Sequence, residues 1–220
     1  MLKTGEANPP DATPALRPRE RNKLDKLKRI KAAARELFLV QGYDSATTRE
    51  IARRAEVGLG TLFSYASDKR DLLFLIYNDL QDELTTTAFA HRTSSRTFLG
   101  QVMASFAPYY RFFAQEPEFM RYVLRELTFY SHGRQSARFQ AGREQIITGL
   151  EGFVRDARQK RQQRPTAKDR VVAQLIFGVY QAEIRLWLSE KHPKPAAGLA
   201  RLRAMLRIVI EGLRPTTSAA

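Results

Sequence analysis

Apolar residues recur at three- and four-residue steps along most of this chain, and no stretch alternates apolar and polar residues for long enough to predict a strand. The pattern starts near Lys23, where one helix face carries Leu24, Leu27, Ile30, Ala34, Leu37 and Phe38. Gly42 follows at a place that suits the end of a helix. The spacing therefore predicts an all-α protein in which each helix buries one apolar side.

Two short helical segments follow this first helix. Thr47 and Glu50 form a capping box that opens the first of them. A break at residues 56–59 separates it from a second short segment at residues 60–65, and a long apolar helix starts near Lys69. A capped helix, a tight break and a second short helix make up the helix-turn-helix arrangement, which sets its second helix into the major groove of DNA.

The C-terminal part of the chain contains a heptad-like seam. Its members step by three and four residues: Leu199, Leu202, Leu206, Val209 and Leu213. The preceding helix carries a second apolar group: Val172, Leu175, Ile176 and Val179. Because the seam is too apolar to be left in water, we expect these nine residues to form the interface of a homodimer.

The charge of the chain narrows the choice of partner without settling it. Lys and Arg number 37 against 23 Asp and Glu, a net charge of +14 that favours polyanions. The absence of cysteine excludes disulfides and thiolate chemistry. No apolar run approaches the ~18 to 20 residues of a membrane helix, and the first 20 residues lack the apolar core of a secretory signal. We expect a cytoplasmic protein with no membrane partner.

Residues 46–73, ATTREIARRAEVGLGTLFSYASDKRDLL, resemble the DNA-binding domain of TetR (TetR/AcrR) family transcriptional regulators. The matching positions include the two threonines and these residues: Ile51, Ala52, Ala55, Val57, Gly60, Thr61, Leu62, Phe63, Tyr65, Lys69, Leu72 and Leu73. The sequence departs from the family pattern in three places. Glu56 stands where the family has a turn glycine, Gly58 replaces a serine cap, and Ala66 replaces an aromatic residue.

The resemblance assigns DNA contacts to two groups of residues. It implies phosphate contacts from Thr47, Thr48, Phe63, Tyr65 and Lys69. It implies that the groove is faced by Arg49, Gly58, Leu59, Gly60, Thr61 and Ser64. These roles are physically reasonable, since hydroxyls and helix-terminal N–H groups anchor phosphates and small residues let a helix approach the bases. The alternative for Tyr65 is a core position.

The resemblance also implies an effector site in the helical second domain. Candidate ligand-binding residues are Phe106, Tyr109, Phe113, Tyr130, Arg143, Phe153 and Tyr180. Each aromatic residue could instead be ordinary core. Because the second domain is basic and Arg143 interrupts an apolar helix face, an anionic or lipophilic small-molecule effector is favoured over a cation.

The family architecture divides the chain into four parts. We expect a flexible arm at residues 1–20, a helix-turn-helix domain at 21–68, a helical ligand-binding and dimerisation domain at 69–214, and a flexible tail at 215–220. The expected function is that of a homodimeric one-component regulator. The resemblance favours a repressor that a small molecule releases from a palindromic double-stranded DNA operator.

Two alternatives remain open at this stage. One is an architectural or activating DNA-binding protein without an effector. The other is a helical-bundle enzyme, although the sequence lacks a glycine-rich phosphate loop, a nucleophile elbow and a helical carboxylate–histidine repeat. None of His91, His132 and His192 lies near a carboxylate at metal-ligand spacing. We therefore expect no catalytic residues, no metal and no cofactor.

Overall fold

The structure is a computed structural model that describes residues 17–90 and 97–211. Within these ranges the secondary structure is helical and contains no strand, which confirms the all-α prediction. The helices are α1 (Pro18–Val40), α2 (Thr48–Arg54), α3 (Leu59–Tyr65), α4 (Lys69–Ala90), α5 (Phe98–Gln115), α6 (Pro117–Glu126), α7 (Ser136–Lys160), α8 (Lys168–Leu188) and α9 (Pro195–Glu211).

The first helix starts earlier than the sequence suggested. Pro18 opens α1, because a proline at the first helical position loses no helical hydrogen bond. Residues 18–20, which were expected in a flexible arm, are therefore helical. Residues 1–16 of that arm and the expected tail at 215–220 lie outside the described residues.

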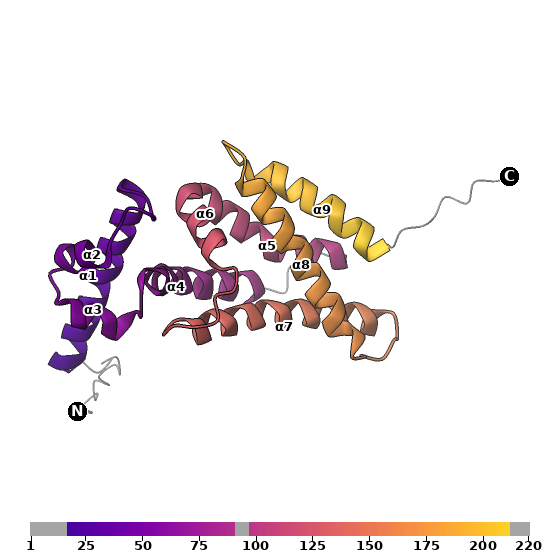
Figure 1. The fold of residues 1–220 in the computed structure, drawn as a ribbon. Coiled ribbons are helices and arrows are strands. Elements are labelled where there is room, and N and C mark those ends of the chain that lie inside the picture. Colours follow the sequence, from indigo (N-terminus) through magenta and orange to yellow (C-terminus); the bar gives the residue numbers. More distant parts are fainter. Residues whose placement is uncertain (1–16, 91–96, 212–220) are drawn as a thin grey trace, which may run out of the picture.

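Helices α1, α2 and α3 form a group at one end of the molecule, and α4 connects this group to the remaining helices (Figure 1). Ile30 and Phe38 of α1, Ile51 of α2 and Leu62 of α3 have no exposed surface. Thr47 caps α2 as expected: its side chain accepts a hydrogen bond from the Glu50 N–H, and the Glu50 carboxylate accepts one from the Thr47 N–H. Local capping and one shared core thus fix the position of α3.

The turn between α2 and α3 is strained at Glu56. This residue has a φ of 52°, in the left-handed region where a Cβ atom is unfavourable. Its carboxylate lies 3.1 Å from the Arg29 guanidinium, but the Glu56 side chain is 82% exposed. An exposed ion pair of this kind contributes only ~0 to 1 kcal/mol.

We expect Glu56→Gly to be more stable than Glu56→Ala by about 1 kcal/mol, because glycine adopts a positive φ without steric cost. Both variants lose the Arg29 ion pair, so their difference isolates the backbone strain. Urea unfolding of the two variants measures it. Equal stabilities would mean that the turn relaxes around alanine.

The second group of helices packs in layers. In Figure 1, α7 runs below α4 and meets the lower end of α8, and α9 lies beside α8; α9 also packs on α5. The close approach of α9 depends on Gly198, since a Cβ there would lie 2.5 Å from the Tyr110 ring and 2.7 Å from the Trp187 ring. Phe106 and Tyr180 stack at 4.2 Å between ring centroids and join α5 to α8.

The predicted dimer seam needs correction. Ile176, Leu202 and Leu206 have no exposed surface, because this side of α8 and α9 packs on helices of the same chain. They cannot contact a second copy while the chain is folded in this way. Four other members of the predicted interface are half-buried, namely Val172, Val179, Leu199 and Val209. Leu213 lies outside the described residues.

A different apolar surface lies on the opposite side of these two helices. We call it the exposed α8–α9 face; it consists of Val171, Leu175, Leu186, Met205 and Ile208, which are 37% to 60% exposed. Gly178 and Ala182 continue the stripe on α8 with small exposed residues. Of the residues predicted for the interface, Leu175 belongs to this face.

Helix α8 is also the one described helix that is long and apolar enough to cross a membrane. Its other side, however, is part of the protein core, with Ile184 and Trp187 fully buried. Two buried acidic residues of α8 pair with arginines of neighbouring helices, Asp169 with Arg158 and Glu183 with Arg201. These contacts identify α8 as a core helix of the bundle.

Candidate DNA interface and ligand cavity

Helix α3 presents one side to solvent. Leu59, Gly60 and Ser64 are exposed on it, whereas Leu62 is buried and holds the helix on α1 and α2. A Cβ atom added at Gly58 or Gly60 would meet nothing within 4 Å, and neither residue has a positive φ. Packing within the chain therefore does not require these glycines. Small residues on an exposed helix face suit the close approach of DNA bases and backbone.

The remaining predicted DNA contacts surround this face but differ in their own partners. Arg49 is exposed near the start of α2 and forms no hydrogen bond or ion pair with the residues that the structure describes. Lys69 donates a hydrogen bond of 2.9 Å to the Asp44 carbonyl and lies over the Tyr43 ring. Tyr65 is half-buried and donates to the Lys23 carbonyl at 3.1 Å.

The other predicted contacts of this region lie on the same helices. Thr48 and Thr61 are half-buried, Thr47 is exposed, and Phe63 packs partly against the core. The Thr47 hydroxyl already caps α2. The structure thus brings the predicted DNA-contacting residues into one region formed by α2, α3 and the start of α4.

Sequence reasoning missed a basic groove beside α3. It has a volume of about 750 Å³ and is lined by Arg19, Asn22, Lys23, Lys26, Thr61, Ser64, Tyr65, Arg134 and Gln135. The recurrence of basic residues on the first turns of α1 was the available signal. The predicted arm at residues 1–20 includes Arg19, so the sequence pattern does not place this residue on the first helix. The groove extends the positive surface around α3 and can attract the phosphates of DNA.

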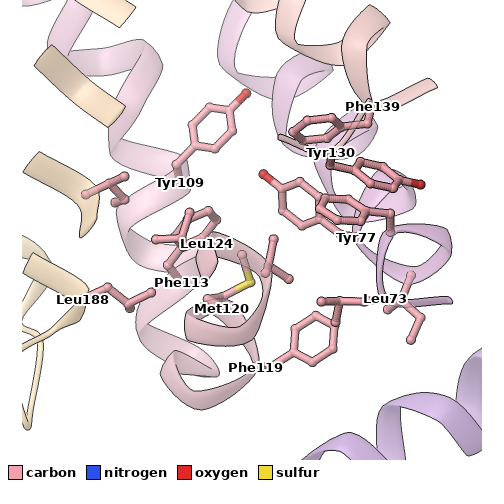
Figure 2. Close-up of a cluster of buried hydrophobic side chains, with 14 of the residues drawn as sticks. Leu73, Tyr77, Tyr109, Phe113, Phe119, Met120, Leu124, Tyr130, Phe139 and Leu188 are labelled. Atoms are coloured by element: carbon pink, nitrogen blue, oxygen red, sulfur yellow. The ribbon is translucent and has the colours of Figure 1, made fainter. Parts of the chain in front are cut away.

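A cavity of about 540 Å³ lies among α4, α5, α6, α7 and α8. Four of the seven predicted ligand-binding residues line it, namely Tyr109, Phe113, Arg143 and Tyr180. Figure 2 shows Tyr109 and Phe113 of α5 across from Tyr77 and Phe139. Burial raises the pKa of Tyr109 to about 12, so its hydroxyl, which lies 2.9 Å from Thr85, is neutral at physiological pH.

The other three predicted ligand-binding residues do not line this cavity. Phe106 lies behind Tyr180 and stacks on its ring. Tyr130 stacks on Phe74 at 3.9 Å and points its hydroxyl at Asp71. Phe153 packs on Phe89, with 5.7 Å between the ring centroids.

The cavity also has polar walls that the sequence did not reveal. Arg185, Gln81, Gln174 and Gln181 contribute to them. Arg185 donates to the Gln181 side-chain oxygen at 3.1 Å. Burial lowers the pKa of Arg185, and the positive charge of Arg143 adds to this shift. The cavity is therefore lined mainly by aromatic and aliphatic side chains, and Arg143 and Arg185 add positive charge to its wall.

Asp71 of α4 connects the segment after α3 to the segment before α7. Its carboxylate has no exposed surface and accepts hydrogen bonds from the backbone N–H groups of Ser67, Arg134 and Gln135 and from the Tyr130 hydroxyl. Burial alone would raise the pKa of Asp71, but these four donors outweigh it and hold the pKa below its ordinary value. The hydrogen bonds at this junction therefore stabilise the ionised form of the Asp71 carboxylate.

The loop after α6 touches both the cavity and α3. Leu127, Thr128 and Phe129 line the cavity. A few residues later, the Arg134 guanidinium donates to the Phe63 carbonyl at 3.0 Å, and the Gln135 amide donates to the Tyr65 carbonyl at 3.1 Å. A displacement of this loop would therefore act directly on the end of α3.

Helix α6 makes a second connection. Leu124 lines the cavity, and the next residue, Arg125, forms two hydrogen bonds with the Asp44 carboxylate at 2.7 and 3.0 Å. Asp44 lies in the segment between α1 and α2, and its carbonyl is the acceptor for Lys69. The Arg125 ion pair lowers the pKa of Asp44. The α6 helix and the loop after it thus link the cavity to the first three helices at two separate points.

Residues 17–90 and 97–211 contain no group of three or more His, Cys, Asp or Glu side chains that could hold a metal ion.

Comparison with known sequences identifies the N-terminal part. Residues 30–76 match the family described as bacterial regulatory proteins, tetR family, a range that extends beyond the expected boundary at residue 68 into α4. A curated relative, the HTH-type transcriptional regulator HbdR of Aromatoleum sp. (strain CIB), is 43% identical over 53 residues. This match spans 24% of the chain and only 23% of the relative.

Comparison with solved structures extends the likeness to most of the chain. FadR of Thermus thermophilus, a TetR family repressor in complex with lauroyl-CoA, has a TM-score of 0.66 at 21% identity, covering 88% of this chain and 98% of that one. FadR of Bacillus subtilis, in complex with stearoyl-CoA, has the same TM-score at 18% identity, covering 85% and 99%. At such identities the likeness concerns the fold. Residues 30–76 therefore match the tetR family of bacterial regulatory proteins, and the chain as a whole shares the fold of solved TetR family regulators.

Proposed function

We propose that the chain is a ligand-responsive transcriptional regulator that acts in the cytoplasm as a homodimeric repressor. The observation that carries this proposal is the segment from Leu124 to Gln135. It contributes to the wall of the cavity at one end and donates a hydrogen bond to the last residue of α3 at the other. A ligand in the cavity and DNA on α3 therefore act on one continuous piece of structure.

The proposed mechanism is a shift between two arrangements of the α1–α3 group. An effector that prefers the arrangement unable to fit DNA releases the operator, by no more than its difference in affinity for the two arrangements. The contacts that can transmit this shift from the cavity are the Arg125–Asp44 ion pair and the hydrogen bonds of Arg134 and Gln135 with α3. The two FadR proteins of similar fold were solved in complex with acyl-CoA, which supports a small-molecule effector for this chain.

The proposed dimer uses the exposed α8–α9 face. Its apolar residues would otherwise remain in water, and both helices lie far along the chain from α3. A two-fold dimer presents two copies of α3 to DNA, so the operator is expected to be a palindrome.

A combined binding experiment tests the function. DNA fragments from a randomised library are selected on the full-length protein, and metabolites are then screened for release of the selected DNA. A palindromic consensus and release by at least one small molecule support a ligand-responsive regulator. DNA binding that no metabolite relieves would favour an architectural protein, and absence of sequence preference would contradict the proposal.

Arg49 and Lys69 are expected to contribute differently to DNA binding. Arg49 is exposed and has no hydrogen-bond or ion-pair partner among the described residues, and its guanidinium suits the O6 and N7 atoms of guanine. We expect Arg49→Ala to cost ~1 to 3 kcal/mol and to relax the preference for one base pair per half-site. Lys69→Ala should weaken the binding of all DNA sequences alike and reduce the salt dependence of binding, because a phosphate contact releases counterions without reading bases.

The measurement is a randomised-site selection with both variants at two salt concentrations. Arg53→Ala serves as control, since this arginine is exposed on the same helix as Arg49 and the resemblance gives it no base contact. If Arg49→Ala keeps the wild-type preferences while Lys69→Ala changes them, the two roles are assigned wrongly.

A further inference from the structure

The charges that line the cavity are all of one sign. Arg143 of α7 and Arg185 of α8 belong to its wall, and none of the described lining residues is Asp or Glu. The remaining walls are mainly aromatic and aliphatic, with Tyr109, Phe113 and Ile147 among them. An apolar chamber with two unbalanced cations favours an anionic ligand over a neutral or a cationic one.

The two arginines are unusual for their own helices. Arg138 and Arg158 of α7 and Arg170 of α8 each form an ion pair with a carboxylate. Arg143 and Arg185, in contrast, form no ion pair with a described residue. Arg143 donates to the Gln140 side chain at 3.1 Å and lies over the Phe177 ring, and Arg185 bonds to Gln181.

The surroundings of Arg185 destabilise its positive charge. It is half-buried, and both burial and the charge of Arg143 lower its pKa, which shows that the charged form is disfavoured there. Two like charges that face one cavity repel each other, and a bound anion would turn that repulsion into attraction. Perturbed groups of this kind gather at binding sites more often than elsewhere.

A buried glutamine gives an independent indication of a ligand. Gln81 is 2% exposed and lines the cavity, and no described residue donates a hydrogen bond to its side-chain oxygen. Gly142 makes room for it, because a Cβ there would lie 2.4 Å from the Gln81 amide nitrogen. Gly142 directly precedes Arg143, so this unpartnered polar group lies near the backbone that carries one of the two arginines. Buried polar atoms without a partner are rare and call for an explanation such as a ligand or water.

We propose that the cavity binds an amphipathic anion, with the acidic group held between Arg143 and Arg185 and the hydrocarbon or aryl body among the aromatic side chains. This inference names the effector class of the proposed regulator and rests on that function only in calling the ligand an effector. Two sources share the chemistry: the carboxylate of a free organic acid, and the phosphate groups of an acyl thioester of coenzyme A.

The test compares probes that differ in the head group alone. Binding of dodecanoate, dodecanol, dodecyltrimethylammonium and lauroyl-CoA to the full-length protein is measured by calorimetry. We expect an anion to bind and the alcohol and the cation to bind at least about 10-fold more weakly, as for loss of a charge-assisted hydrogen bond. Tighter binding of dodecanoate identifies a free acid as the source, and tighter binding of lauroyl-CoA identifies the thioester.

Arginine variants locate the site. Arg143→Gln and Arg185→Gln are each expected to weaken the binding of the anion about 10-fold to 100-fold and to leave the binding of dodecanol unchanged. Arg111→Gln is the control, because this arginine is exposed on α5 and does not line the cavity. Equal binding of dodecanol and dodecanoate, unchanged anion binding in both variants, or failure of both anions to bind overturns the proposal. Binding of an anion without release of DNA leaves it standing and contradicts the proposed regulatory function instead.

Discussion

Asp71→Ala is expected to lower the free energy of unfolding by about 3 to 5 kcal/mol, the range seen when one partner of a buried charged network is removed. The substitution leaves three backbone N–H groups and the Tyr130 hydroxyl without their acceptor in a site with no exposed surface. Two of those N–H groups belong to Arg134 and Gln135, so the contacts of these residues with α3 should loosen as well. Urea unfolding followed by circular dichroism measures the loss.

Asp82→Ala is the matched control on the same helix. Asp82 pairs with Arg138 at the surface, where both side chains are more than 40% exposed, and removal of such a pair costs only ~0 to 1 kcal/mol. Similar losses in the two variants would show that Asp71 is no more than another ion-pairing residue.

The pH dependence of stability provides a second measurement of the same junction. The pKa of Asp71 lies below its ordinary value in the folded protein, so its contribution to stability is complete above the ordinary pKa of ~4 and is lost as the pH falls through the folded pKa. Asp71→Asn should therefore lose less stability than the wild type when both are acidified below about pH 4. Parallel acid titrations of both proteins would contradict this account.

The helix-turn-helix could be predicted from the sequence because its signals are local. The Thr47–Glu50 capping box lies within four residues, and Glu56, which stands where the family pattern has a turn glycine, has a positive φ. Such features depend on neighbouring residues alone and do not require knowledge of the tertiary structure.

The dimer seam could not be assigned in the same way. A three- and four-residue repeat shows that one helix face is apolar, but not whether its partner is the same chain or a second copy. Helix α8 has both kinds of face: Ile176 is buried within the chain, and Leu175, one position earlier, is 53% exposed. The two residues are chemically alike, so only the packing of α8 on α7 and α9 separates them.

The cavity was predictable only in part for a similar reason. Tyr109 and Phe106 lie on one helix within a single turn, yet only Tyr109 lines the cavity, while Phe106 supports Tyr180 from behind. Gln81 and Arg185 carried a weak signal as polar residues on apolar helices. Their significance depends on which helices meet, and that information is not local.

Leu175→Glu is expected to give folded monomers and to weaken operator binding by more than about 100-fold, equivalent to roughly 3 kcal/mol. Leu175 is 53% exposed in the single chain, so the introduced carboxylate can remain in water while the protein is monomeric. In a two-fold dimer built on the exposed α8–α9 face, the same substitution would bring two charges into an apolar interface. Each monomer would then read one half-site alone. Light scattering and gel shifts measure the two effects.

Two further variants separate this interface from the core and from a general effect of surface charge. Leu206→Glu should unfold the protein, because Leu206 has no exposed surface in its own chain and its new charge would be buried there without a partner. Val40→Glu makes the same kind of change at a side chain that is 78% exposed on α1, and it should leave the oligomeric state unaltered. A Leu175→Glu protein that stays dimeric would place the interface elsewhere. A Leu206→Glu protein that folds and dissociates would restore the heptad seam as the contact between copies.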